Sequence, residues 1–411
     1  WDFHFQDDDQ RDPAEIQEEL AEKIRQAVER QCMGDVPIGS YLSGGMDSGT
    51  VTMLTARKLG RIFTFTGGFD LSEATEREQR FDERELAEKM SSLFQTEHYE
   101  CVMHSGDMEA AMMDLVRHLE DIRLGQCYPN YYMCRLASRF VKVVLSGAGG
   151  DELFGGYPWR YAAAIGPGED DFVANYYLYW QRLVSNQEKK ILYTPQTTQR
   201  LLAEGTNQYM PFRNHTLNVF RSILAGLNGP SPDTLAQQVN SSLYFECKTF
   251  LHGLLVVDDK LAMAHSLEQR IPFLDNDLVD LACTIPVRHK VAGIDHLERL
   301  DENLQHKTGY YHEKMHTGKT VLRGAMEKHL PSEITRARKQ GFSAPDESWF
   351  RGRSEQYVRK MLLGNDSRIG ELLNREYIDG VLESHCKGRN NKRLLIWSLL
   401  SLEAWLRIFQ S

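Results

Sequence analysis

The chain has 411 residues, of which 41% are hydrophobic and 26% charged, an ordinary globular composition with enough length for two domains of usual size. Its formal net charge of -10 argues against broad, sequence-independent binding to nucleic acid. No apolar stretch approaches the roughly 18 to 20 residues of a membrane span, and no basic segment followed by an apolar one opens the chain. We therefore expect a cytoplasmic protein that partners neither nucleic acid nor membrane.

Helix and strand signals alternate in the first part of the chain. Pro13 in a first helical turn and apolar residues at helical spacing predict an amphipathic helix over 12–32. The strands that we expect next are 36–42, 61–69, 96–102 and 141–147, and the helices between them are 47–59, 81–94, 107–120 and 130–140. This alternation predicts an α/β fold, a doubly wound and mostly parallel sheet with flanking helices.

The predicted strand 141–147, VKVVLSG, is β-branched and apolar, which is typical of a strand buried on both faces of a parallel sheet. Strand signals disappear from about residue 170, where helical spacing takes over. We expect a linker and leading helix over 1–30, an α/β core over 31–165 and a mostly helical region over 166–411.

Seven cysteines lie scattered along the chain without CxxC pairs or regular spacing. This distribution is typical of reduced thiols in the cytosol. We expect neither a disulfide nor a structural zinc site.

A glycine turn, SGGMDS, follows the predicted strand 36–42 and runs into a helix. Backbone N–H groups at a helix start lack intrahelical partners and favour anionic oxygen. Gly44 and Gly45 allow a phosphate to approach the backbone, and Ser43 and Ser48 add hydroxyl donors. The turn therefore predicts a phosphate site.

Asp47 is the unexpected member of this turn, because a carboxylate repels a phosphate unless a cation lies between them. One reading makes Asp47 a ligand of Mg²⁺, and the other makes it an ordinary acidic residue in the first turn of a helix. The hexapeptide alone favours neither reading.

A second turn, SGAGGDE over 146–152, repeats the arrangement after the next buried strand, with Ser146 at its start and Asp151 and Glu152 at its end. Ligands of such sheets lie at the carboxyl ends of the strands, so two carboxylates there can hold one Mg²⁺ that bridges phosphates. GxxxxGK[ST] does not occur in the sequence. A phosphate loop without its lysine suits cleavage between the α and β phosphates, with pyrophosphate as the leaving group.

SGGMDS resembles the pyrophosphatase loop of the ATP pyrophosphatase superfamily. Four further segments, in the same order along the chain, resemble the synthetase domain of the glutamine-dependent asparagine synthetase family: VKVVLSGAGGDELFGGY (141–157), DDKLAMAHSLEQRIPFLD (258–275), RKQGFSAPDESWF (338–350) and LLIWSLLSLEAWL (394–406).

The resemblance implies an ATP-dependent, AMP-forming ligase that adenylates the carboxylate of a small acid and transfers ammonia to it. It implies that Asp47 and Asp151 hold Mg²⁺ and that Lys339 reaches the α phosphate. Without the resemblance, Lys339 reads as a surface lysine in a basic run. The nucleotide and its pyrophosphate would be bound by Leu42, Ser43, Gly44, Gly45, Asp47, Ser48, Ser146, Gly147 and Asp151.

Two departures from the family pattern leave the reaction open. The asparagine synthetases have glutamate where this chain has Ala148, so an amine nucleophile, as in β-lactam synthetases or peptide-cyclising ligases, is one alternative. A non-catalytic nucleotide-binding subunit is another. The chain also begins at Trp1 in what resembles the linker after the glutaminase domain, and we expect that domain to be absent from this chain or supplied by another. The sequence is also compatible with a homo-oligomer.

Other polar residues have structural readings. Glu268, Arg270 and Asp275 suggest a structural ion pair that holds the helical layer, because such clusters usually fix geometry. His98 lies in a predicted strand, where we expect it to find a local partner.

Overall fold

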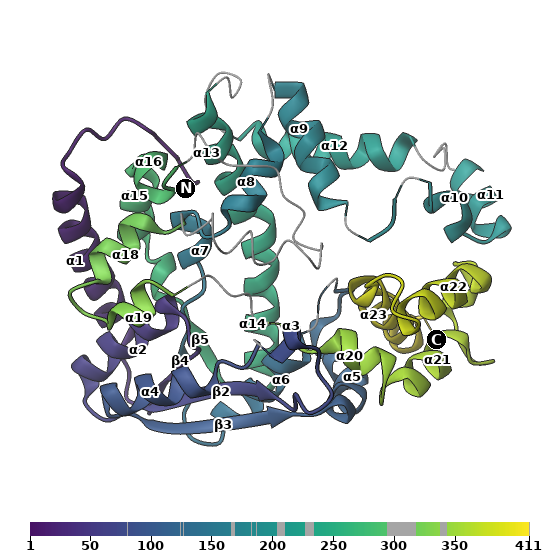
Figure 1. Ribbon diagram of the computed structural model, residues 1–411, viewed down its shortest axis with the longest axis horizontal. Coiled ribbons are helices and arrows are strands. Elements are labelled where there is room, and N and C mark those ends of the chain that lie inside the picture. The colour runs from purple at the N-terminus through teal and green to yellow at the C-terminus, as the bar shows by residue number, and fades with distance from the viewer. Residues whose placement is uncertain are drawn as a thin grey trace.

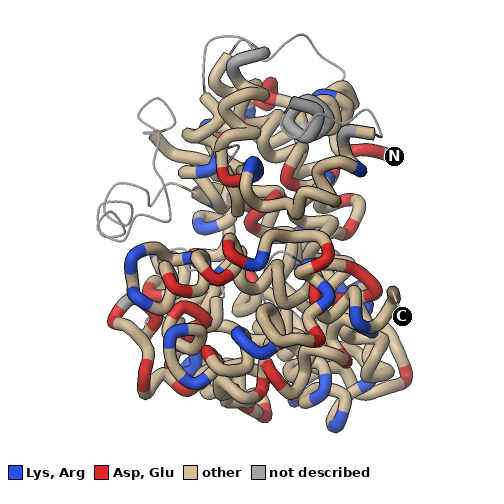
Figure 2. Tube along the Cα trace, turned by 90° about the vertical axis from the view of Figure 1, so that its right-hand side faces the viewer, with Lys and Arg blue, Asp and Glu red and all other residues tan. Residues whose placement is uncertain are grey.

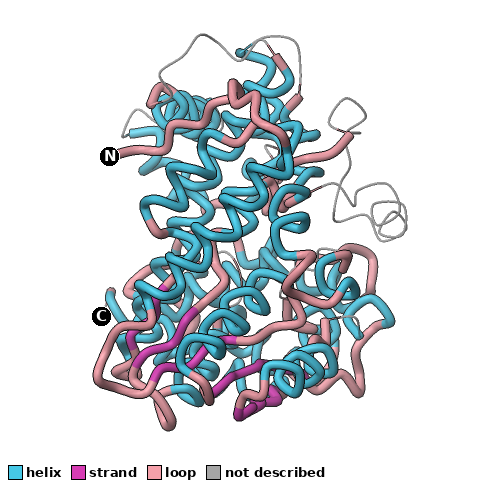
Figure 3. The backbone as a smooth tube through the Cα atoms, turned by 90° about the vertical axis from the view of Figure 1, so that its left-hand side faces the viewer, coloured by secondary structure: helices cyan, strands magenta, loops and turns pink. Residues whose placement is uncertain are grey.

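The computed structural model describes residues 1–411 except 80, 124, 126, 166–168, 182, 186, 204–209, 227–233, 294–317, 338–342 and 411. Figure 1 shows a sheet along one side of the molecule with helices stacked above it. Figure 3 shows the strands gathered in one half, whereas the half that contains the N-terminus is built of helices and loops.

Five parallel strands form one sheet in the order β3-β2-β1-β4-β5. In the register, Ser40 of β1 lies opposite Thr64 of β2 on one side and Leu145 of β4 on the other. The strands are β1 (Ile38–Tyr41), β2 (Phe63–Phe69), β3 (Glu97–Met103), β4 (Val143–Leu145) and β5 (Glu268–Arg270).

Helices cover both faces of the sheet, and each face has its own hydrophobic core. On β4, Val143 and Leu145 belong to one core and Val144 to the other, so this strand is buried on both faces as predicted. The first core is covered by α1 (Pro13–Gln31), α2 (Met46–Leu59) and α4 (Arg84–Phe94), and the second by α5 (Ser105–Leu119), α6 (Tyr128–Ala137) and α14 (His252–Ala264).

The predicted fold class is confirmed, and each element predicted before residue 148 has its counterpart in the structure. The expectation that strands end by about residue 170 is wrong, because β5 adds a fifth strand beside β4. Its three residues are Glu, Gln and Arg, so they lack the apolar alternation that marks a strand. The domain boundaries stay predictions.

Helix α1 shows how local sequence sets these elements. The carboxylate of Asp12 accepts a hydrogen bond from the N–H of Ala14 at 2.8 Å, and Pro13 supplies the first helical turn. The apolar stripe on this helix is fully buried, as its spacing predicted, at Ile16, Leu20, Ile24, Ala27 and Val28.

The remaining described elements are helical, and several are short. They are α3 (Glu76–Gln79), α7 (Gly150–Phe154), α8 (Pro158–Ala164), α9 (Glu169–Trp180), α10 (Lys189–Leu192), α11 (Pro195–Ala203), α12 (Met210–Leu224), α13 (Leu235–Glu246), η1 (Cys247–Leu251), η2 (Pro272–Leu274), α15 (Asn276–Thr284), α16 (Val287–Lys290), α18 (Thr320–Met326), α19 (Ser332–Thr335), α20 (Asp346–Arg351), α21 (Glu355–Leu363), η4 (Ile369–Glu371), α22 (Arg375–Cys386) and α23 (Arg393–Phe409).

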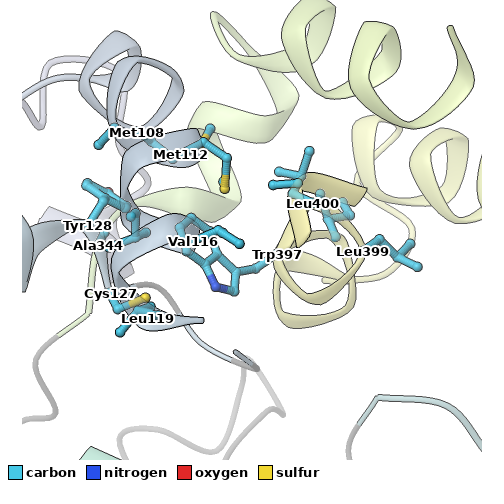
Figure 4. Packing of buried hydrophobic residues seen from close by; sticks show 14 of the residues in the cluster. Met108, Met112, Val116, Leu119, Cys127, Tyr128, Ala344, Trp397, Leu399 and Leu400 are labelled. Carbon is cyan, nitrogen blue, oxygen red and sulfur yellow. The ribbon is translucent and has the colours of Figure 1, made fainter. Parts of the chain in front are cut away.

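The closing helix α23 is part of the larger core. Figure 4 shows Trp397 directed toward the helix that carries Val116, with Met112 nearby. Trp397 and Val116 are each 1% exposed, and the ring of Trp397 lies 5.8 Å from that of Tyr128. Burial of this aromatic face therefore fixes the C-terminal helices to α5 and α6.

The first residues of the chain cross the helical half as an extended segment. The N–H of Gln6 donates to the carbonyl of Cys283 at 2.8 Å, and the carboxylate of Asp7 accepts from the N–H of Val287 at 2.8 Å. Asp7 is exposed, and its carboxylate caps the start of α16. Figure 2 shows acidic and basic residues interspersed along the described chain on the side that it presents.

All seven cysteines are free, as predicted. Among the described residues, no helix is both long and apolar enough to cross a membrane. His98 has the local partner that was expected, because its Nδ1 lies 3.0 Å from the hydroxyl of Thr64 on the neighbouring strand.

Candidate active site

The two glycine turns predicted from the sequence follow neighbouring strands. β1 and β4 lie side by side at the point where the strand order reverses, with β2 and β3 to one side and β5 to the other. In open parallel sheets the crevice outside the carboxyl ends at this switch point is where ligands bind. The turn after β1 and the turn after β4 both open there.

The first turn is held together by its own serines. The N–H of Ser43 donates to Oγ of Ser48 at 3.1 Å, the two hydroxyl oxygens lie 2.9 Å apart, and the N–H of Gly45 donates to Oγ of Ser43 at 3.1 Å. The predicted hydroxyl donors thus shape the turn in this structure. Gly45 is the N-cap of α2 and no side chain caps this helix, so its first turn presents main-chain N–H groups at the crevice.

Gly147 brings the second turn against the first. A Cβ placed on Gly147 would lie 2.6 Å from the main-chain nitrogen of Ser48 and 2.8 Å from the carbonyl carbon of Asp47. A Cβ on Gly150 would likewise lie 2.8 Å from Cγ of Asp47. Only glycine allows this approach, so the two turns form one continuous surface.

Asp47 and Asp151 meet at the ammonium group of Lys319. Nζ of Lys319 lies 2.6 Å from Oδ1 of Asp151 and forms a hydrogen-bonded ion pair with Oδ2 of Asp47. All three side chains are largely buried, with exposed fractions of 7% for Lys319, 15% for Asp47 and 11% for Asp151. The two carboxylates are therefore directed at one position of positive charge.

The electrostatics of this group favour the charged lysine. Burial is the largest single influence and lowers the pKa of Lys319, but the charges of Asp151 and Asp47 outweigh it and raise the pKa to about 12. Removing the lysine from this buried group would leave two carboxylates uncompensated, which is strongly destabilising. The three residues thus act as a unit.

The residues present fit a magnesium ion. Mg²⁺ is typically bound through one or two carboxylates, with waters and substrate phosphates as its other ligands, and Asp47 and Asp151 supply that pair. Among the described residues, no group of three or more His, Cys, Asp and Glu side chains could hold a metal by itself. A metal here would depend on phosphate oxygens, as the glycine turns suggest.

Sequence reasoning missed Lys319. It is the N-cap of α18, with a left-handed backbone at φ 59°, and its N–H donates to the carbonyl of Phe154 at 3.1 Å. A lysine at a helix N-terminus opposes the helix dipole, and a left-handed conformation is uncommon outside glycine. The first of these conflicts is readable from the sequence once the helix start is known, and such conflicts mark functional sites.

The other predicted site residues differ in how the structure places them. Leu42 is 1% exposed and packs in the core, and its N–H donates to the carbonyl of Phe65 at 2.9 Å. Ser146 shapes the second turn, because its Oγ accepts from the N–H of Ala148 at 3.3 Å. Gly44 lies at the tip of the first turn against Leu86. Lys339 lies outside the described residues.

Glu152 points away from the metal position. Its side chain is 2% exposed and accepts a hydrogen bond from the hydroxyl of Tyr157 at 3.1 Å. Asp151, directly before it, has its carboxylate against Gly156, where a Cβ would come within 1.9 Å of Oδ1. The sequence DELFGG therefore separates two adjacent acids into a structural residue and a site residue.

The predicted structural ion pair exists between Arg270 and Glu268, whereas Asp275 pairs with Arg30, which the sequence reasoning did not name. Nε of Arg30 donates to Oδ2 of Asp275 at 2.8 Å, and Nε of Arg270 donates to Oε1 of Glu268 at 2.7 Å. Nη1 of Arg270 also donates to the carbonyl of Gln31 at 2.7 Å. These contacts hold the segment around β5 to the end of α1.

Arg323 links the segment of Lys319 to the chain before Lys339. Its Nε donates to the carbonyl of Gly318 at 3.0 Å, and its Nη1 donates to the carbonyl of Ala337 at 3.0 Å. Burial lowers the pKa of Arg323 below its ordinary value, but an arginine stays charged in proteins. One side chain on α18 thus ties Gly318 to Ala337.

Comparison with known proteins gives a family match over most of the chain. A family model described as asparagine synthase matches residues 19–407. Asparagine synthetase (glutamine-hydrolyzing) 1 of Bacillus subtilis (strain 168) is 24% identical and aligns over 96% of this chain and 60% of its own length. A putative asparagine synthetase (glutamine-hydrolyzing) of Mycobacterium tuberculosis (strain ATCC 25618 / H37Rv) is 27% identical over 95% of this chain and 58% of its own length.

Relatives with another name also match. The amidase chyE of Penicillium rubens (strain ATCC 28089 / DSM 1075 / NRRL 1951 / Wisconsin 54-1255) is 24% identical over 88% of this chain and 58% of its own length. The chain thus spans 58–60% of the length of these three relatives.

Proposed function

The chain belongs to the asparagine synthase family, and from this membership we propose that it is an ATP-dependent ligase that amidates a carboxylic acid. The observation that carries the proposal is the meeting of the two glycine turns at the switch point, with Asp47 and Asp151 directed at one positive charge. A crevice with main-chain donors and a carboxylate pair suits a nucleotide with its metal.

The proposed first step is adenylation, because a carboxylate is a poor acyl donor. An oxygen of the substrate carboxylate bonds to the α phosphorus of ATP, the bond from that phosphorus to the bridging oxygen breaks, and pyrophosphate leaves. A nitrogen lone pair then bonds to the acyl carbon, AMP leaves and the nitrogen loses a proton. Magnesium, when bound, supplies positive charge that stabilises the departing pyrophosphate.

The residues of the chain have distinct proposed roles in this step. Asp47 and Asp151 would hold the metal, and the N–H groups at the start of α2 would donate to phosphate oxygens. Gly147 would keep the turns close enough to grip one triphosphate. Lys339 is proposed to reach the α phosphate, where charge develops.

The proposed nitrogen donor is ammonia released by a glutaminase domain or chain. The Bacillus subtilis and Mycobacterium tuberculosis relatives carry "glutamine-hydrolyzing" in their names, and the chain aligns with 60% and 58% of them. We do not assign the acid to aspartate, because a relative that is as similar as the Bacillus subtilis protein, the one from Penicillium rubens, is named an amidase.

Ala148 favours a second candidate, the same adenylation followed by attack of an amine already present in the substrate. Ala148 lies in the second turn, where its methyl group cannot accept or donate a proton. Because Ala148 has no titratable group, the proton lost by the attacking nitrogen would have to pass to another group. A non-catalytic nucleotide-binding subunit is disfavoured, because the carboxylate pair is intact.

A screen of carboxylic acids for substrate-dependent exchange of labelled pyrophosphate into ATP tests the adenylation step without its second nucleophile. We expect one class of acid to support exchange, and Asp151→Asn to lower it by roughly 10²-fold or more, because the metal loses half of its protein ligands. Asp114→Asn, which removes an exposed carboxylate paired with Arg117 on α5, is the matched control and should exchange as the wild type does.

The second stage distinguishes the two nitrogen donors. With the active acid in hand, amide formation that requires added ammonium supports the amidating ligase, whereas AMP release without ammonium supports the amine-ligating reaction. Binding of ATP without exchange for any acid that carries a free carboxylate would overturn the ligase proposal in both forms.

A further inference from the structure

Lys319 lies where a metal held by the carboxylate pair would have to lie. Its ammonium contacts Oδ1 of Asp151 at 2.6 Å and is bonded to Oδ2 of Asp47, and these two carboxylates come from different turns. One compact cation and one metal ion cannot both occupy the point between the same two oxygens. The structure therefore shows the pair bound to the lysine.

The backbone holds Lys319 in place but leaves its side chain long enough to move. The N–H of Lys319 donates to the carbonyl of Phe154 at 3.1 Å, and a Cβ on Gly318 would lie 2.5 Å from the carbonyl oxygen of Gly155. The segment 318–319 is thus docked on the end of α7, the helix that follows the second turn. A lysine has four flexible carbons between this anchor and its charge, so the ammonium can shift without moving the backbone.

Charge balance indicates what would move the ammonium of Lys319 away from the two carboxylates. The two carboxylates and the ammonium together carry one net negative charge, so a divalent cation added to them alone would leave a net positive charge in a buried site. The negative charges of a triphosphate remove this excess. They also offer the ammonium new acceptors a short distance from its present ones.

We propose that Lys319 is an internal counter-ion, which occupies the metal position of the nucleotide-free protein and gives it up when the metal arrives with nucleotide. This inference rests on the proposed function, because it takes the carboxylate pair to be a metal site. Its consequence is an order of binding, in which the divalent cation enters as a complex with the nucleotide and not alone.

Mn²⁺ binding in the absence of nucleotide, followed by electron paramagnetic resonance of the free ion, tests this proposal without any catalytic readout. The wild type should bind Mn²⁺ weakly at this site. Lys319→Met removes the charge at similar length and should bind Mn²⁺ at least about tenfold more tightly, because the carboxylates lose their competing cation. Lys319→Arg keeps a cation and should bind as weakly as the wild type.

Two variants identify the site that Lys319→Met exposes. Asp47→Asn combined with Lys319→Met should lose the added affinity, because the pair is broken. Lys328→Met is the matched control, since Lys328 is 80% exposed and its nearest ion-pair partner, Glu18, is 3.8 Å away, and this variant should bind Mn²⁺ as the wild type does.

Thermal unfolding gives a second readout. Lys319→Met should melt below the wild type without metal, because two buried carboxylates are left uncompensated, and Mn²⁺ should raise its Tm while leaving that of the wild type nearly unchanged. If Lys319→Met fails to fold, Mn²⁺ binding by the nucleotide-free wild type still tests the proposal. Tight Mn²⁺ binding by the nucleotide-free wild type that is lost in Asp47→Asn would overturn the proposal.

The same measurements separate this proposal from the proposed function. If wild-type protein binds Mn²⁺ tightly without nucleotide, or Lys319→Met gains no affinity, Lys319 is not a counter-ion, but the metal site stands wherever Asp47→Asn weakens binding of Mn²⁺ with an ATP analogue. If Asp47→Asn weakens Mn²⁺ binding neither without nucleotide nor with an ATP analogue, the proposed metal site is wrong, and the counter-ion proposal is wrong with it.

Discussion

Substitution of Gly147 by alanine is the sharpest perturbation of the site that the structure offers. The new Cβ would lie 2.6 Å from the main-chain nitrogen of Ser48, which falls short of an ordinary contact distance of 3.4 Å by 0.8 Å. The atoms that it meets belong to the first turn of α2, so they cannot rotate away as a side chain would. The two turns must separate by nearly an ångström.

A displacement of this size at a reacting centre costs roughly 10²-fold in rate, which corresponds to about 2.7 kcal/mol in the activation free energy. We therefore expect Gly147→Ala to lower acid-dependent pyrophosphate exchange by about that factor. The overpacking itself should cost about 1–3 kcal/mol of unfolding free energy, so urea unfolding is needed to choose conditions in which the variant stays folded.

Gly380→Ala is the matched control for this experiment. A Cβ on Gly380, within α22, meets no atom within 4 Å, so this variant should keep wild-type exchange and gain up to about 1 kcal/mol of stability. Exchange by folded Gly147→Ala within about twofold of the wild type would refute the reasoning that the turns must touch.

Two further predictions concern stability. Asp275→Ala removes the N-cap of α15 and the partner of Arg30, so it should lower the unfolding free energy by about 1 kcal/mol in urea titrations. Asp277→Ala removes an exposed 3.3 Å contact with Arg30 and one acidic charge in the first turn of α15, but no cap, and an equal effect of this variant would contradict the capping argument. Burial, and then the charge of Arg351, lowers the pKa of His385 from 6.5 to about 4, and the ring is 0% exposed. The stability conferred by this neutral ring is therefore full above pH 6.5 and is lost as the pH falls toward 4. Between pH 7 and pH 5 the unfolding free energy of the wild type should fall by about 2 kcal/mol more than that of His385→Gln. Equal losses in the two proteins would show that His385 is not the group responsible.

The α/β core was predictable because its signals are local. The stripe on α1 from Ile16 to Val28 and the apolar β4 each follow from a few neighbouring residues. The position of the glycine turns followed from one general rule, that parallel strands end at the same edge. β5 carried no such signal, because its three residues are polar. Their extended conformation comes from pairing with β4 and not from a pattern of their own.

The carboxylate pair was predicted from the two turns, but the partner that the structure gives it was not. Lys319 is separated from Asp47 by 272 positions, and only the docking of residues 318–319 on Phe154 and Gly155 brings it to the site. Contacts at such separation leave no periodicity in a sequence. The strain at Lys319 becomes a functional signal only once its backbone conformation is known.

The central claim is that the turns after β1 and β4 grip the triphosphate of ATP together with its metal, and a crystal structure with magnesium and a non-cleavable α,β-methylene analogue of ATP tests it most directly. The account predicts the β and γ phosphates against residues 43–48, the metal between Asp47 and Asp151, and the ammonium of Lys319 moved onto phosphate oxygen. A nucleotide bound elsewhere, or one bound here with Lys319 still paired to both carboxylates and the metal apart from them, would contradict it.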